Sequence, residues 1–333
     1  MTWINWRRGD KAAAETAASI AAPIGEAQLR EAAATLERYR RGKARLEQRV
    51  LEDEEWYKLR HWEALRRQSG EPAPACEPTS AWLFNVIMQK HADAMDNYPE
   101  PEIFPREAGD QPEAEALSAI LPVLLEYNGF EQTYSDNWWE KLKHGTAVYG
   151  VYWNRDKENG LGDVDIRRVD LLNLFWEPGV CDIQNSRNVF VTELRDIDLL
   201  EAEYPFLAGR LHGGALAQQY VYDDTVDTSQ KAMVVDWYYK VRGADGRTRL
   251  HYVKFVEDQL LYASENDPQL ADQGWYQHGR YPFVFDVLFP EKDTPVGFGL
   301  VAVTKDPQLY IDRLGGNILA ASIANTRQRK HNV

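Results

Sequence analysis

The spacing of apolar residues is helical in the first part of the chain. Between residues 26 and 68 they recur every three or four positions, or at sums of those steps, with arginine and glutamate between them. This pattern predicts an amphipathic helix that is exposed on one side. The Gly- and Pro-rich run 69–74 ends it and predicts a linker. The apolar positions are Leu29, Ala33, Leu36, Tyr39, Leu46, Val50, Leu59 and Trp62.

Three more helices are predicted before the pattern changes, over residues 79–97, 112–127 and 131–144. Tyr98 and Pro99 break the first of them. Gly145 lies just past the last, where a left-handed cap is expected because glycine adopts positive φ without strain.

After Gly145 the period changes from near 3.6 to 2, which predicts strands. Over residues 147–153, apolar and aromatic side chains alternate with other residues, as in a strand. Residues 164–169 form a return strand, and the loop 154–162 joins the two strands as a hairpin. Further strands are expected at 174–176, 189–191, 233–241, 250–256, 260–262 and 283–288, with a short helix at 196–204. Helices, then antiparallel strands, then one helix make an α+β chain without βαβ repeats.

The last forty residues are the most informative. Gly297 and Gly299 mark a turn, and Asp306 before Pro307 predicts the start of a helix over about 307–326. Gly315 and Gly316 in its middle require a packing reason, since each costs about 1 kcal/mol relative to alanine. One stripe is apolar, with Leu309, Leu314, Ile318, Ala321 and Ile323, and the other face carries Asp312, Arg313, Asn317 and Asn325. We expect such a helix to find its neighbours in other subunits.

Length and composition indicate a folded chain of several parts. We expect a flexible segment at 1–24, a helical part at 25–145, a β-rich part at 146–292 and a terminal helix with a basic tail at 293–333.

The net charge of −14 argues against a protein that grips nucleic acid along its whole surface. Two distant cysteines exclude a disulfide framework and suit a reducing cytoplasm. No apolar run approaches the ~20 residues that span a bilayer, so no membrane is expected.

No motif of catalysis or of cofactor binding stands out. The sequence has no phosphate-binding loop, no HExxH and no GxSxG, and the seven histidines are scattered. Asn154, Asp156 and Glu158 resemble a calcium loop, but the glycine comes one residue late, and a solvated hairpin tip is favoured. Tryptophans beside carboxylates, such as Trp139 with Glu140, suggest a glycosidase cleft, but strand-borne aromatics favour a core. We therefore expect no catalytic, cofactor-binding or metal-binding residues.

Three stretches, in this order, resemble the portal proteins of tailed double-stranded DNA bacteriophages. The first is NVIMQKHADAMDNYP at 85–99 followed by PEIFPRE at 101–107 and AEAL at 114–117. The second is HGTAVYGVYW at 144–153 with DIRRVD at 165–170, LFWEPG at 174–179 and the segment 195–205. The third is PVGFG at 295–299 with KDPQLYIDRL at 305–314. Leu171 and Glu177 depart from the family, which often has proline and aspartate there.

The resemblance implies a portal fold, with a helical wing, an antiparallel β-rich wing and a stem helix at the C-terminal end. It implies a homo-oligomeric ring, commonly a dodecamer, at one vertex of the capsid in the virion, assembled in the host cytoplasm. It further implies that a terminase motor packages double-stranded DNA through the ring without sequence specificity, and that the DNA is later ejected. The terminase large subunit, the capsid protein and a head–tail adaptor are the implied partners. The family's clip, second stem helix and crown would follow where this chain ends, so a truncation after the first stem helix is expected.

Residues of the terminal helix are the expected subunit interface and channel surface, and the basic tail is a candidate for DNA contact. Two alternatives stay open: an acid-rich carbohydrate-active hydrolase, and a non-enzymatic tail or adaptor protein. The interface and channel candidates are Asp306, Gln308, Asp312, Arg313, Gly315, Gly316 and Asn317, and the DNA candidates are Arg327, Arg329 and Lys330.

Overall fold

The computed structural model describes residues 24–70, 76–213, 229–243 and 246–329. Its contacts divide the chain into two compact units, each made of segments that are distant in sequence. Unit 1 combines the chain up to Arg45 with Asp170–Pro282 and Asp293–Pro295. Unit 2 combines Leu46–Val169 with Phe283–Lys292 and the chain from Val296 onward. Most of the expected N-terminal segment, residues 1–23, lies outside the described residues.

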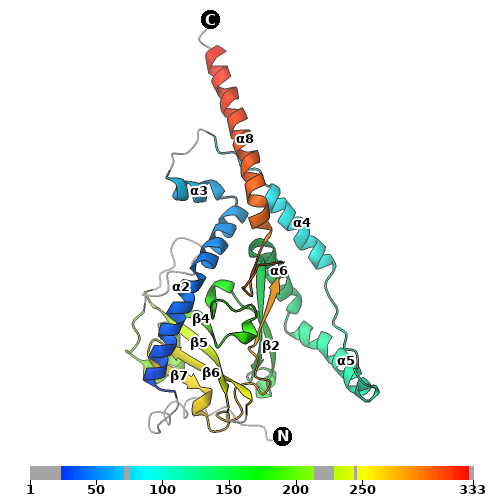
Figure 1. Cartoon of the computed structure of the whole chain (residues 1–333), viewed down its shortest axis with the longest axis vertical. Helices are drawn as coiled ribbons and strands as arrows, with labels where there is room; N and C mark the ends of the chain where they lie inside the picture. The colour runs from blue at the N-terminus through cyan, green and yellow to red at the C-terminus, as the bar shows by residue number, and fades with distance from the viewer. Residues whose placement is uncertain (1–23, 71–75, 214–228, 244–245, 330–333) are drawn as a thin grey trace. The chain divides into compact units, whose positions relative to one another are not determined.

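Unit 1 is built on a five-stranded antiparallel sheet in the order β3-β4-β5-β6-β7 (Figure 1). Successive residues of β5 serve opposite faces, as the strand period requires. Val235 packs with residues of helix α2 (Glu26–Tyr57), whereas Val234 packs with residues of α7 (Ile197–Glu203) and the turn after it. The strands are β3 (Leu174–Trp176), β4 (Asn188–Asp196), β5 (Lys231–Arg242), β6 (Thr248–Val256) and β7 (Gln259–Ala263).

Unit 2 combines helices with a three-stranded sheet in the order β2-β1-β8 and a two-stranded pair of β9 with β10. Its core joins Trp56, Leu83, Ile87, Leu142 and Val301. The strands are β1 (Thr146–Asn154), β2 (Asp163–Arg168), β8 (Phe283–Val287), β9 (Phe289–Pro290) and β10 (Gly297–Phe298). The helices are α3 (His61–Ser69), α4 (Trp82–Asp96), α5 (Gln111–Tyr127), α6 (Phe130–His144) and α8 (Leu300–Arg329), and α2 continues into this unit from Leu46.

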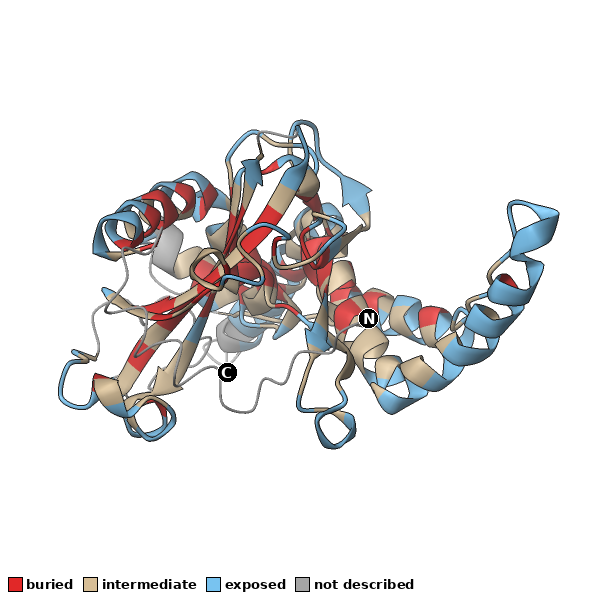
Figure 2. Cartoon of the chain, turned by 90° about the horizontal axis from the view of Figure 1, so that it is seen from below, coloured by how far each residue is buried: buried red, intermediate tan, exposed pale blue. Residues whose placement is uncertain are grey.

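Short 3-10 turns link these elements, and buried residues follow the strands of both units (Figure 2). No described helix is long and apolar enough to cross a membrane. The turns are Ala108–Asp110, Glu158–Gly160, Leu171–Asn173, Ile183–Asn185, Pro205–Leu207 and Ser264–Asn266.

The α+β class with antiparallel sheets is confirmed, and so is the hairpin after Gly145, in which Trp153 pairs with Val164. The single helix predicted over 26–68 is wrong, because the structure has α2 and α3 with a break between them. Leu59 adopts φ 59°, and the amide of Arg60 donates to the carbonyl of Glu55, which is the bonding of a Schellman cap. That cap usually contains glycine, so the sequence carries no signal for it.

The predicted start of the terminal helix is also wrong. Helix α8 begins at Leu300 rather than near Pro307, and Pro307 lies inside it. A proline removes one backbone hydrogen bond from a helix interior. Val301 is buried in the core of unit 2, and this burial stabilises the helical turns between Leu300 and Pro307. These turns therefore stay helical in spite of the proline.

Glycines allow two backbone segments of unit 2 to touch where α8 begins. Gly145 caps α6 with φ 86°, and its amide donates to the carbonyl of Lys141, as predicted. A Cβ on Gly145 would lie 2.0 Å from the carbonyl carbon of Phe298. A Cβ on Gly299 would lie 2.1 Å from the carbonyl oxygen of Lys143. Only glycine fits at either position, so the end of α6 fixes the start of α8.

We expect Gly145→Ala to destabilise the protein much more than Gly179→Ala. Both glycines have φ 86°, but a Cβ on Gly179 meets nothing within 4 Å. Left-handed strain alone costs about 1–2 kcal/mol, and forced overpacking at Gly145 adds roughly 1–3 kcal/mol. Urea unfolding of the two variants measures the difference. Equal losses would show that the contact with Phe298 relaxes without cost.

Candidate functional site: the C-terminal helix and its anchor

Helix α8 is buried on one face and only over its first half. Val301, Gln308, Asp312 and Gly316 are buried, and steps of seven, four and four residues place them on a single face. No side chain between 317 and 326 is buried. Figure 1 shows α8 continuing past its contacts with α4 and α6. The second half of the helix thus makes little contact within unit 2.

Two polar side chains of α8 attach it to the beginning of α4. The amide of Leu83 donates to Oε1 of Gln308 at 3.2 Å, and the amide of Ser80 donates to Oδ1 of Asp312 at 2.8 Å. Nε2 of Gln308 donates to Oδ2 of Asp312 at 2.8 Å and to the backbone carbonyl of Ser80. The first amides of a helix have no partner inside it, so these side chains cap α4 from another helix.

A buried histidine completes this anchor. Nε2 of His61 lies 3.0 Å from Oδ2 of Asp312, and the His61 ring stacks on Trp56 with 4.6 Å between the ring centres. Burial lowers the pKa of His61 more than the charge of Asp312 raises it. The neutral form of the imidazole is therefore favoured.

The glycine pair of α8 faces its own chain. A Cβ on Gly316 would lie 3.1 Å from the carbonyl oxygen of Cys76 and 3.3 Å from Cδ of Pro78. A Cβ on Gly315 would lie 3.6 Å from Cγ of Pro78, which is an ordinary contact. The close approach of the segment before α4 gives a packing reason for Gly316.

These contacts sort the residues predicted for the interface. Gln308, Asp312 and Gly316 face their own chain. Asp312 is predicted on the face away from the apolar stripe, and it is that face which is buried here, where the amide of Ser80 donates to Asp312. Asp306, Arg313 and Asn317 are exposed, and Gly315 is half-buried. The side chains of Arg327 and Arg329, and all of Lys330, lie outside what the structure describes.

The opposite face of α8 is apolar, and no segment that the structure describes covers it. Val303, Tyr310, Leu314 and Ile318 follow one another at steps of seven, four and four, and the last three are 70%, 63% and 61% exposed. Leu319 and Ile323 continue the inner face beyond Gly316 and are also exposed. A helix with apolar residues on two uncovered sides is typical of one that packs against partners.

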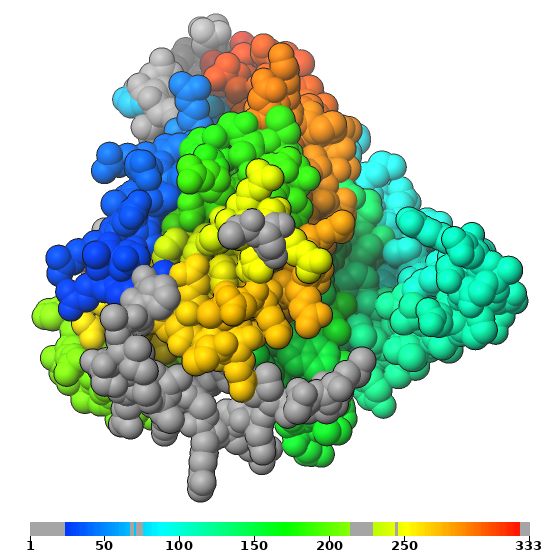
Figure 3. All heavy atoms as spheres, turned by 60° about the horizontal axis from the view of Figure 1, so that its bottom comes forward, coloured from blue at the N-terminus to red at the C-terminus, as the bar shows by residue number. Residues whose placement is uncertain are grey.

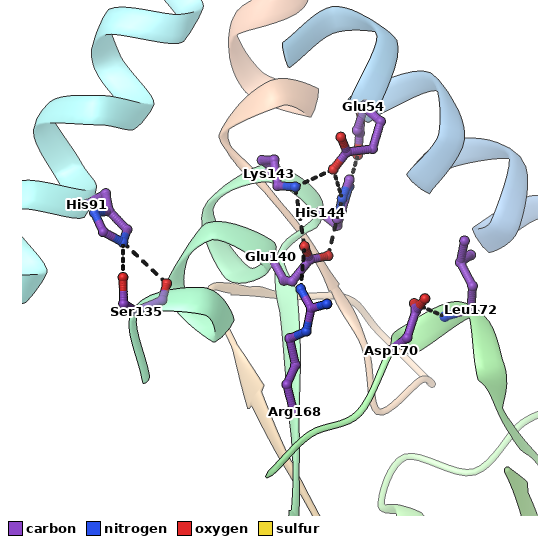
Figure 4. Close-up of polar contacts among 10 residues, drawn as sticks. Glu54, His91, Ser135, Glu140, Lys143, His144, Arg168, Asp170 and Leu172 are labelled. Carbon is purple, nitrogen blue, oxygen red and sulfur yellow. Dashed lines mark hydrogen bonds and ion pairs between the residues drawn. The ribbon is translucent and has the colours of Figure 1, made fainter. Parts of the chain in front are cut away.

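A second group of polar residues joins α2 to the end of α6 (Figure 4). The ammonium of Lys143 donates to Glu54 and, at 3.3 Å, to Glu140. Nε2 of His144 lies 2.9 Å from Oε1 of Glu54, and its Nδ1 lies 3.7 Å from Oδ2 of Asp53. Lys143, His144 and Asp53 are buried, so each charge here needs its neighbours.

The pKa values of Glu54 and His144 are shifted in opposite directions by their neighbours, which shows that these charges stabilise one another. Burial by itself raises the pKa of Glu54, but hydrogen bonds and charge from His144 and Lys143 outweigh it and lower the pKa to about 2. Burial by itself lowers the pKa of His144, but the carboxylates of Asp53 and Glu54 outweigh it and raise the pKa. The group therefore favours ionised glutamate and protonated histidine together.

Glu54, Glu140 and His144 hold their ligand atoms within 4.8 Å of one another, which is a donor set that suits a divalent metal. In this structure the ammonium of Lys143 is bonded to both glutamates and supplies the positive charge. The arrangement works as an ionic tie between two helices. Its one local signal in the sequence is the i,i+4 spacing of Glu140 and His144, since Glu54 is 90 residues away.

The other chemical candidates belong to the framework of each unit. Trp176 is buried and Trp237 packs on the core of unit 1. In unit 2 the ring of Trp139 stacks on the ring of His91, with 3.8 Å between the ring centres. Near the calcium-like run, Asp165 is paired with Lys157 and Arg167 in the hairpin. These contacts favour a core and a solvated hairpin over a sugar cleft or a calcium loop.

Comparison with known proteins supplies the family. A family model described as "Phage P22-like portal protein" matches residues 34–285, which is well over half of the chain. The match confirms the resemblance to phage portal proteins. No curated protein matches the chain.

We expect Asp312→Ala to lower the free energy of unfolding by about 3 kcal/mol, because it leaves the donors at Ser80 and Gln308 without their acceptor. Asp306→Ala in the same helix is the control, since Asp306 is exposed, and it should change stability by less than about 1 kcal/mol. Chemical denaturation compares them. Similar values for both would mean that the anchor adds nothing to stability.

The stability of the fold should depend on pH through the carboxylate of Glu54. Its folded pKa of about 2 lies below its ordinary value of 4.5, so its stabilisation is present above pH 4.5 and is lost as the pH falls toward 2. We expect Glu54→Gln to cost roughly 3 kcal/mol at pH 6 and progressively less below pH 4.5. Denaturation at a series of pH values tests this, with the exposed Glu100→Gln as control. A cost that does not depend on pH would contradict the ionic tie.

Proposed function

Because this chain belongs to the phage P22-like portal protein family, we propose that it is a subunit of a homo-oligomeric ring at the portal vertex of a capsid. Double-stranded DNA is packaged through the ring by a terminase motor and is later ejected through it. The ring is commonly a dodecamer in this family. The protein acts in the virion, and it is made and assembled in the host cytoplasm.

The observation that carries this proposal is the uncovered apolar surface of α8. Leu314 and Ile318 are more than 60% exposed, and the described part of the chain covers neither. Identical subunits that meet through two different surfaces form a closed ring when the rotation closes. Burying these side chains between neighbouring copies of α8 would remove apolar surface from water, at about 25 cal/mol per Å².

The length and charge of α8 suit the wall of a channel. Its 30 residues span about 45 Å at 1.5 Å per residue. Asp306, Arg313 and Asn317 lie on an exposed side of mixed charge and are the proposed channel residues, with Arg327, Arg329 and Lys330 as candidate DNA contacts. A net charge of −14 suits a passage that must not hold phosphate tightly, so DNA passes without sequence specificity.

In this proposal the helices before β1 and the antiparallel sheets form the wing of the portal, and α8 is its stem helix. The protein has a structural role rather than an enzymatic one. Its partners are the terminase large subunit, the capsid protein and a head–tail adaptor. The packed tryptophans and the paired Asp165 support this over the hydrolase alternative.

We expect the protein to form discrete high-mass rings, and Leu314→Asp with Ile318→Asp to leave monomers, because the interface would bury unpaired carboxylates. Native mass spectrometry at several concentrations and negative-stain images of rings with a central hole are the measurements. Asn317→Asp adds one negative charge per chain, half that of the paired variant, at a neighbouring exposed position and should assemble normally.

Two outcomes would contradict this account. Rings of the paired Leu314 and Ile318 variant would show that this face of α8 is not the interface. A parent protein that stays monomeric at every concentration would contradict ring formation by this chain and would favour the tail or adaptor alternative.

A further inference from the structure

Helix α5 carries a second apolar face that the described chain leaves uncovered. Only Ala114 of its 17 residues is buried. Leu117, Ile120, Val123 and Tyr127 follow at steps of three, three and four residues and are 49% to 77% exposed. These steps put them on one face of the helix, and Figure 3 shows α5, in teal, open to solvent in that view.

The surroundings of this face are acidic. Five exposed carboxylates lie between residues 106 and 127, and Arg106 is the one basic residue in that range. A partner that covers the apolar residues therefore gains from positive charge at its rim. The carboxylates are Glu107, Asp110, Glu113, Glu115 and Glu126.

The same chain offers a surface of opposite charge on α2. Arg38, Arg41 and Arg45 are exposed on one face, which Arg30 and Ala34 extend toward the beginning of the helix. Arg38 donates to the hydroxyl of Thr35, and Arg41 and Arg45 have no carboxylate partner within the described residues. In a chain with net charge −14, a face of this kind is complementary to α5.

We propose that the apolar face of α5 docks on the arginine face of α2 in a neighbouring copy of the chain. The arginine stems cover Leu117, Ile120 and Val123, and their guanidinium groups reach the carboxylates at the rim. Arginine and tyrosine are both enriched in protein interfaces. This inference rests on the proposed ring, to which it adds a second contact between neighbouring subunits.

The dimensions of the two faces agree. Glu113 and Glu126 are 13 residues apart, or about 20 Å along a helix, and Arg30 and Arg45 are 15 residues apart, or about 22 Å. Arg30 pairs with Glu26 at 3.2 Å, but both side chains are exposed, so its guanidinium has donors left for a second carboxylate. Acidic groups near both ends of α5 can therefore meet arginines at the same time. Because the two faces differ, each subunit presents one to each neighbour, as a closed ring requires.

Charge reversal tests the pairing. We expect Glu113→Arg with Glu126→Arg, or Arg30→Glu with Arg45→Glu, to weaken assembly by about tenfold or more, since like charges would meet. One chain that carries all four reversals should assemble to within about threefold of the parent, because the pairing is restored with opposite signs. Asp258→Lys, on an exposed loop, should have no effect. Native mass spectrometry over a dilution series measures each, and circular dichroism checks folding.

Cross-linking between different chains shows whether the contact is intermolecular. In a Cys76→Ser and Cys181→Ser background, one chain carries Ile120→Cys and a second carries Arg41→Cys. We expect oxidation of the mixed rings to give a disulfide-linked pair of the two chains. A mixture of Ile120→Cys with Asp258→Cys is the control and should give none.

The results separate this proposal from the ring itself. Rings without the cross-link, or rings that tolerate either charge reversal alone, would overturn the α5–α2 contact and leave the α8 interface standing. Loss of the parent ring at all concentrations would overturn both. A chain with both cysteines that cross-links only within itself would show that α5 is covered by its own α2.

Discussion

The close backbone contact between the end of α6 and the start of α8 is the constraint on which the rest of unit 2 depends. Gly145 and Gly299 lack side chains at the points where Phe298 and Lys143 approach. The carbonyl of Gly145 also accepts the amide of Leu288, so the chain after β8 is attached at the same place. A single Cβ would separate these segments. The direction of α8, and with it the choice of exposed residues, follows from the contact.

Buried polar groups then hold α8 and the part of α2 from Leu46 onward within unit 2. Gln308 and Asp312 satisfy donors at the beginning of α4, which would otherwise be buried without acceptors. Glu54 and Glu140 compensate Lys143 and His144 at the end of α6. Such groups add little stability compared with apolar packing, but leaving one unpaired is costly. They therefore select one arrangement of the helices more than they strengthen it.

Among the residues that the structure describes, that arrangement leaves apolar faces on α8 and on α5 without partners. A monomer that exposes both is expected to associate. Membership of the portal family gives the form of association, a ring, and the two faces suit different contacts. The residues of the α8 face are apolar and recur at helical spacing, which favours packing against another helix. The α5 face has an acidic rim, which favours an arginine-rich neighbour and a contact that weakens with salt.

The sequence by itself determined the features that depend on neighbouring residues. The antiparallel hairpin, the left-handed cap at Gly145 and the succession of helices and strands follow from periods and caps within a few positions. The order of its motifs also identified the family. Tertiary structure alone decided the rest. Pro307 predicted the start of a helix, but α8 begins at Leu300, because Val301 and Gly299 pack against the rest of unit 2. Asp312 is buried because it accepts from the amide of Ser80, 232 positions away, and Glu54 meets His144 across 90 positions. Local patterns report the conformation of a segment, whereas the face it buries depends on distant segments whose contacts leave no trace in its own spacing.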